Sequence, residues 1–165
     1  MPASSAQLLI STHCPHCPAA LAALTGLVKS GALARLEIVN LEADPQAGAA
    51  LGVRSVPWAK IGRIELAGVH TPAEYADWAA KAESEAGLAD WFHILLKEGR
   101  LARVQALVEA EPALLAAVLP IVGNVDASLN VRLGAGVLFE TFAGGDALAA
   151  LIPRLGELSA HADAR

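Results

Sequence analysis

The two cysteines of this 165-residue chain stand three positions apart, in a Cys-Pro-His-Cys segment at residues 14–17. Such spacing at the start of a helix brings two sulfurs within disulfide reach. The unpaired N–H groups and the dipole of the helix then stabilise a thiolate on the first sulfur. Cys14 is the expected nucleophile, and Cys17, one turn into the helix and more buried, is the expected resolving thiol. The spacing therefore predicts thiol–disulfide chemistry.

Three neighbours of the pair are candidates for tuning that chemistry. Pro15 fixes the turn and gives up only an N–H donor that has no partner at a helix start. His16 lies between the sulfurs and His13 precedes them, and a protonated imidazole beside Cys14 would stabilise its thiolate further. A more stable thiolate favours the reduced form and makes the disulfide a stronger oxidant.

A Cys-X-X-Cys pair also occurs in zinc sites and in structural disulfides. Zinc takes four ligands, usually from two such pairs, whereas this chain offers Cys14, Cys17 and nearby histidines. An inert pair is the other alternative. A strand before the pair and a helix after it favour the redox interpretation, which needs no metal and no cofactor.

The first half of the chain alternates between strand-like and helix-like patterns. Four short apolar runs predict strands at residues 7–12, 35–41, 58–61 and 63–67, with Gly62 as the turn between the last two. Helices are expected at residues 18–30, from Asp44-Pro45 to Gly52, and from the capping box of Thr71, Pro72 and Glu74 to Glu85. The predicted order is βαβαββα, with a mixed four-stranded α/β sheet.

Residues 6–86 resemble the thioredoxin superfamily, in the short form of glutaredoxin-like domains. The Cys-Pro-His-Cys tetrapeptide is identical to that of a bacterial disulfide oxidase. Residues 53–57, Val-Arg-Ser-Val-Pro, resemble the segment that holds the cis-proline of the family. The resemblance implies that Pro57 is cis and faces the disulfide, and that the Val56 backbone pairs with a substrate chain. His13 joins these two as a candidate substrate-binding residue.

The chain departs from the family at several positions. His13 stands where thioredoxins have tryptophan, and Leu8 stands where they have a buried acid. Proton handling is then left to His13, His16, Glu42 or water. The segment at residues 68–71 does not match the glutathione-binding pattern, which argues against glutathione use. Trp58, after Pro57, either covers the surface near the disulfide or packs in the core, and the core is the favoured position.

From Gly87 onward the pattern predicts five amphipathic helices of about 10 to 17 residues. We therefore expect two domains, residues 1–86 and 87–165. Residues 115–158 resemble HEAT-type repeats, with Asp126 and Val131-Arg132 at the matching turn, and a plain helical bundle is the alternative. Because such repeats bury their faces on neighbours, an apolar face at residues 145–158 is expected to be exposed and to favour a homodimer.

The composition and the net charge limit the classes of partner and the cellular compartment that we expect for this protein. Hydrophobic residues make up 55% and charged residues 18%, and the net charge is −5. This balance argues against nucleic acid or an anionic membrane as a partner, because both attract basic surfaces. The sequence shows neither an apolar run of about 20 residues nor a basic, apolar leader, so we expect a cytoplasmic protein.

These observations predict a thiol–disulfide oxidoreductase that acts on protein thiols and disulfides. The resemblance implies a donor of the thioredoxin reductase type. The helical domain would bind a redox partner or stabilise the small redox domain. The alternative is a HEAT-like adaptor whose thioredoxin-like module senses redox state or binds partners with little turnover.

Overall fold

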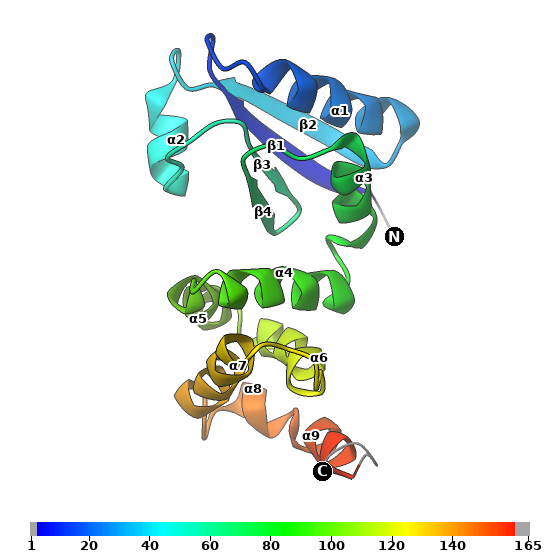
Figure 1. Ribbon diagram of the computed structural model, residues 1–165, viewed down its shortest axis with the longest axis vertical. Coiled ribbons are helices and arrows are strands. Elements are labelled where there is room, and N and C mark those ends of the chain that lie inside the picture. The colour runs from blue at the N-terminus through cyan, green and yellow to red at the C-terminus, as the bar shows by residue number, and fades with distance from the viewer. Residues whose placement is uncertain (1–2, 161–165) are drawn as a thin grey trace. The chain divides into compact units, whose positions relative to one another are not determined.

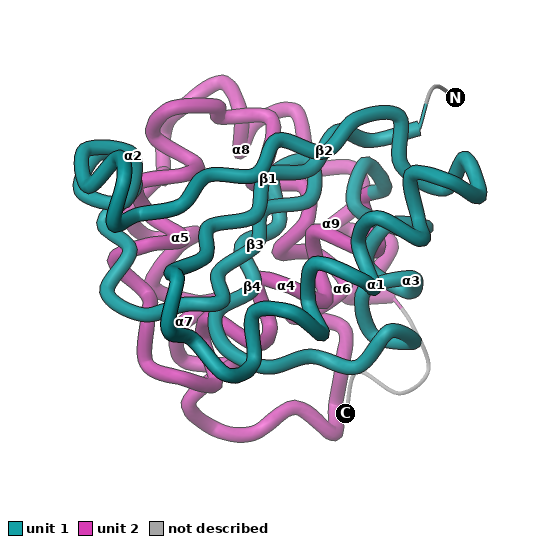
Figure 2. The backbone as a smooth tube through the Cα atoms, turned by 90° about the horizontal axis from the view of Figure 1, so that it is seen from above, with its two compact units in different colours: residues 1–84 teal, residues 85–165 magenta. Residues whose placement is uncertain are grey.

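The computed structural model describes residues 3–160 of the chain. The chain divides between Ser84 and Glu85 into two compact units, coloured separately in Figure 2. No helix within the described residues combines the length and the apolar character that crossing a membrane requires.

The first unit contains the elements in the predicted βαβαββα order (Figure 1). They are β1 (Ser4–Ile10), α1 (Cys17–Ser30), β2 (Leu33–Asn40), α2 (Pro45–Leu51), β3 (Trp58–Ile61), β4 (Ile64–Ala67) and α3 (Pro72–Lys81). The four strands form one sheet in the order β2-β1-β3-β4. Strands β1 and β2 are parallel and the other two pairings are antiparallel, so the sheet is mixed, as predicted.

Strand β1 lies inside the sheet, and its adjacent side chains Leu8 and Leu9 are both fully buried. Because neighbouring side chains of a strand point to opposite faces, both faces of the sheet are covered here. Helix α1 packs against β2 and α3 (Figure 1). Ile10 pairs with Asn40 at the end of β2, and Leu9 pairs with Trp58 at the start of β3. The loops after β1 and β2 and the loop before β3 therefore meet at one edge of the sheet.

Local sequence signals set the ends of several elements. The predicted capping box is present, since the Glu74 amide donates to the Thr71 hydroxyl (3.2 Å) and the Thr71 amide donates to the Glu74 carboxylate (2.6 Å). Helix α3 ends at Lys81, before the predicted Glu85. Ser84 explains this difference, because its amide and its hydroxyl both donate to the Lys81 carbonyl and compete with the next helical turn.

The second unit is helical. It comprises α4 (Glu85–Lys97), α5 (Leu101–Ala110), the 3₁₀ helix η1 (Pro112–Val118), α6 (Leu119–Val122), α7 (Leu129–Thr141), α8 (Asp146–Ala149) and α9 (Ile152–Ser159). The expectation of five long helices is wrong in two places, because η1 with α6, and α8 with α9, replace single helices. Pro120 lies in the first turn of α6, and Pro153 lies in the first turn of α9. A missing backbone N–H has no cost at these positions. Gly87, the predicted boundary, lies inside α4.

Helix α4 is the centre of the second unit and contacts α5, η1, α6 and α7. Its Trp91, Phe92 and Leu95 are almost completely buried. Arg154 of α9 donates to the Glu85 carboxylate at the start of α4, with a shortest distance of 2.6 Å. This hydrogen bond lowers the pKa of Glu85 below its ordinary value of 4.5. The Arg154–Glu85 hydrogen bond therefore links α9 to α4, the first helix of the second unit.

Candidate redox site

Cys14 and Cys17 form a disulfide at the start of α1, with their Cα atoms 5.5 Å apart. Cys17 is 3% exposed, whereas Cys14 is partly exposed. The expectation that Cys17 lies one turn inside the helix is wrong, because it is the first residue of α1 and Cys14 lies in the turn before it. Pro18 explains this start, since a residue without an N–H belongs in the first helical turn. The greater burial of Cys17 is as predicted.

The other residues predicted around the pair lie at the surface. His13, Pro15 and His16 are all exposed, and they belong to the turn between β1 and α1. His16 is the N-cap residue of α1, and its carbonyl accepts from the Ala20 amide (3.4 Å). These three side chains are thus open to a partner molecule, while Cys17 behind them is not.

A ring of three hydrogen bonds holds the chain two residues before Cys14. The Asn40 side-chain amide donates to the Thr12 hydroxyl (3.1 Å), and the Glu42 amide donates to the Asn40 side-chain oxygen (3.0 Å). The Thr12 amide in turn donates to the Glu42 carboxylate (3.0 Å). We call these three residues the Thr12–Asn40–Glu42 ring. It ties the loop that leads to the disulfide to the end of β2.

The ring extends the pairing of the two parallel strands beyond the sheet. The Leu41 amide donates to the Ile10 carbonyl (2.9 Å), directly after the last paired residues of β1 and β2. Sequence reasoning considered Glu42 only for proton handling and missed Asn40 and Thr12. Part of the signal was present, because the polar residues Asn40 and Glu42 stand at the end of the second predicted strand, residues 35–41. Only the register of β1 against β2 shows that these residues meet.

The segment before β3 approaches the same edge of the sheet. The Val56–Pro57 peptide bond is cis, as predicted. Pro57 is buried, Val56 is partly exposed, and the Pro57 carbonyl accepts from the Gly68 amide (3.0 Å). Trp58 is 7% exposed, which confirms that it belongs to the core. Because Trp58 pairs with Leu9, the Val56–Pro57 segment reaches the sheet at the end where β1 leaves it toward Cys14. The contact of Pro57 and Val56 with a substrate stays a prediction.

Strand β1 has an apolar residue at the position where the family that residues 6–86 resemble usually has a buried acid. Leu8, in the strand before the pair, is completely buried. Among residues 3–160, no three His, Cys, Asp or Glu side chains gather in an arrangement that could hold a metal ion.

No protein-family model matches the chain, and no curated protein matches it. The disulfide and its surroundings are therefore the features from which a function can be argued.

Proposed function

We propose that this protein is a thiol–disulfide oxidoreductase that exchanges the Cys14–Cys17 disulfide with the thiols and disulfides of other proteins. The observation that carries the proposal is the unequal burial of a bonded pair at the start of a helix. Cys14 is partly exposed and can be reached by a partner, whereas Cys17 is 3% exposed. This asymmetry separates a nucleophile from a resolving thiol.

The exchange in the reducing direction takes two steps. The Cys14 thiolate attacks one sulfur of a substrate disulfide, a mixed disulfide forms, and the other substrate sulfur leaves as a thiolate that takes up a proton. Cys17 loses its proton to water and attacks the Cys14 sulfur. The second substrate thiol leaves and the Cys14–Cys17 disulfide forms. Two electrons pass to the substrate, and an external dithiol of the kind that a thioredoxin reductase supplies restores the reduced pair.

The surroundings of the pair support a thioredoxin-like assignment of the first unit. The element order, the mixed sheet and the position of the disulfide between β1 and α1 agree with such a fold. In this proposal the substrate chain lies along Val56 and Pro57 and contacts the exposed His13. His16 and Pro15 set the stability of the Cys14 thiolate. The helical unit, with HEAT-like repeats, holds the partner.

The test combines a redox titration with a turnover assay. The pair is equilibrated in dithiothreitol buffers of known potential, and the thiols are counted by mass spectrometry after alkylation. Reduction of insulin disulfides by dithiothreitol is then followed with the wild type and with the Cys14→Ser/Cys17→Ser variant as the matched control. We expect a reversible two-electron couple and an insulin reduction rate well above that of the control.

Single variants separate the two roles. Cys17→Ser should accumulate a mixed disulfide between Cys14 and one sulfur of a protein disulfide substrate such as insulin, because the resolving attack is removed, and Cys14→Ser should accumulate none. Circular dichroism confirms that each variant is folded. A reversible couple with no turnover above the control would favour the alternative, an adaptor with a redox-sensing module. A pair that never forms a disulfide would refute both the oxidoreductase and the sensor.

A further inference from the structure

Helix α7 is apolar on two opposite sides. One stripe, which consists of Val131, Gly134, Ala135 and Leu138, is buried, and α7 contacts α4 and α6. The approach to α4 is close, because a Cβ atom on Gly134 would lie 2.8 Å from a methyl carbon of Leu96. A helix that is apolar on one side only would meet solvent with polar residues opposite this stripe.

The opposite side of α7 is exposed and largely apolar. Leu129, Leu133 and Val137 are 67%, 59% and 38% exposed, and they follow one another at intervals of four residues. Gly136 lies on the same face, with no atom within 4 Å of the position that its Cβ would take. We call these four residues, together with Arg132 and Glu140, the α7 outer face. Three large apolar side chains repeated on one helix face are typical of a contact surface.

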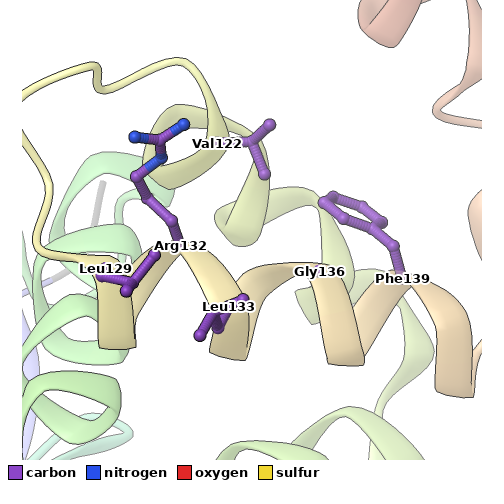
Figure 3. Close-up of a pocket in the computed structure, with 6 residues that line it drawn as sticks. All are labelled: Val122, Leu129, Arg132, Leu133, Gly136 and Phe139. Atoms are coloured by element: carbon purple, nitrogen blue, oxygen red, sulfur yellow. The ribbon is translucent and has the colours of Figure 1, made fainter.

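A shallow hollow runs along this face. It has a volume of about 380 Å³ and is lined by Val122 of α6 and by residues of α7 (Figure 3). In Figure 3, Arg132 and Phe139 extend from α7 on the side where Val122 lies. The face is therefore a groove between α6 and α7 rather than an isolated ridge.

The positions of the two charged residues on the α7 outer face indicate which partner helix the face can bind. Arg132 and Glu140 are both exposed and stand four residues on either side of Gly136, about 6 Å from it along the helix axis. An antiparallel copy of α7 that crosses at Gly136 places Arg132 at the level of the partner's Glu140. Two-fold symmetry repeats this pairing with the roles exchanged. A parallel copy would instead set Arg132 against the partner's Arg132.

We propose that the α7 outer face is the contact of a symmetric homodimer, in which two antiparallel α7 helices cross at Gly136. The open space at Gly136 lets the two backbones approach, and Leu133 meets the hollow beside the partner's Phe139. The opposite charges at equal distances from the crossing select the antiparallel register. This inference uses only the helical unit and does not depend on the redox proposal.

The test is a charge exchange followed by sedimentation equilibrium over a range of protein concentrations. The monomer mass is 16.9 kDa, and the wild type is expected at twice this mass. Arg132→Glu sets two acids against each other at both symmetric sites and should raise the dimer dissociation constant by about tenfold or more. Glu140→Arg should act likewise. The double variant Arg132→Glu/Glu140→Arg restores both opposite pairs and should dimerise like the wild type.

Two further variants keep the test decisive. Glu109→Arg changes an exposed acid of α5 outside the α7 outer face and should leave dimerisation unchanged. Leu133→Asp, at a position 59% exposed, should abolish the dimer while circular dichroism remains that of the folded protein. A wild type that is monomeric at every concentration overturns the proposal. A dimer that persists in Leu133→Asp also overturns it. The same holds if the double variant Arg132→Glu/Glu140→Arg fails to restore the association that the single variants weaken.

Discussion

Replacement of Asn40 by alanine should loosen the chain that leads to Cys14 without touching either cysteine. Asn40 contributes two of the three side-chain hydrogen bonds in the Thr12–Asn40–Glu42 ring. The third bond, from the Thr12 amide to the Glu42 carboxylate, loses the group that orients Glu42. Asn40→Ala therefore removes the link between the ends of two neighbouring strands.

The size of the effect follows from the exposure of the partners. A hydrogen bond contributes about 0.5–1.5 kcal/mol net, and the lower half of this range applies because Thr12 and Glu42 are exposed to water. Loss of two bonds then costs about 1–2 kcal/mol of local stability. This corresponds to a roughly 5- to 30-fold larger equilibrium population of the opened loop.

Amide hydrogen exchange measured by NMR reports this opening directly. The Glu42 and Thr12 amides should exchange faster in Asn40→Ala by that factor, and the rate of insulin reduction should change with them. Asn124→Ala is the matched control, because the Asn124 side chain accepts a local hydrogen bond from the Asp126 amide (3.0 Å). It should speed exchange at Asp126 alone.

Two outcomes would contradict this reasoning. If the Glu42 and Thr12 amides exchange at wild-type rates in Asn40→Ala, the ring does not hold the loop in solution. If Asn40→Ala/Glu42→Ala loses as much protection as the two single variants added together, the residues act independently. A cooperative ring instead gives a coupling of about 0.5 kcal/mol or more.

Four more predictions concern stability. Gly134→Ala forces a methyl group against Leu96 and should lower the free energy of unfolding in urea by about 1–3 kcal/mol. Gly26→Ala in the interior of α1, where the space is open, should raise it by up to about 1 kcal/mol. Tyr75→Phe should leave thermal stability equal or higher, because the buried Tyr75 hydroxyl makes no hydrogen bond to any described residue and burial raises its pKa. Because the pKa of Glu85 is lowered on folding, the Arg154–Glu85 bond stabilises the protein above pH 4.5, and this contribution is lost as the pH falls through the lowered pKa. Glu85→Gln should remove that part of the acid dependence, and the effect should be small because both side chains are about half exposed.

Most of the first unit could be predicted from short stretches of sequence. Each of these signals depends on residues a few positions apart: the capping box of Thr71 and Glu74, the turn at Gly62 and the four short apolar runs. The cysteine spacing belongs to the same class, because three positions at a helix start suffice to bring the sulfurs together. Local signals therefore set the element order and the presence of the redox pair.

The helical unit shows where local reasoning fails. Apolar periodicity continues through residues 112–122 and 146–159, yet the backbone breaks at both places. Pro120 and Pro153 were visible in the sequence, but periodicity reports only which side chains are apolar, not whether each N–H has an acceptor. The backbone hydrogen-bond requirement therefore overrides the side-chain pattern.

The sequence alone determined the order of strands and helices in the first unit, the cysteine pair and the turn that carries it. Only the tertiary structure decided that Thr12 meets Asn40, 28 positions away, and Glu42, 30 positions away. It also decided that one apolar side of α7 is buried and the other exposed. These facts depend on the register between strands and on which helix face finds a neighbour. Both are set by the packing of distant segments, because the side-chain types along α7 are apolar on either side.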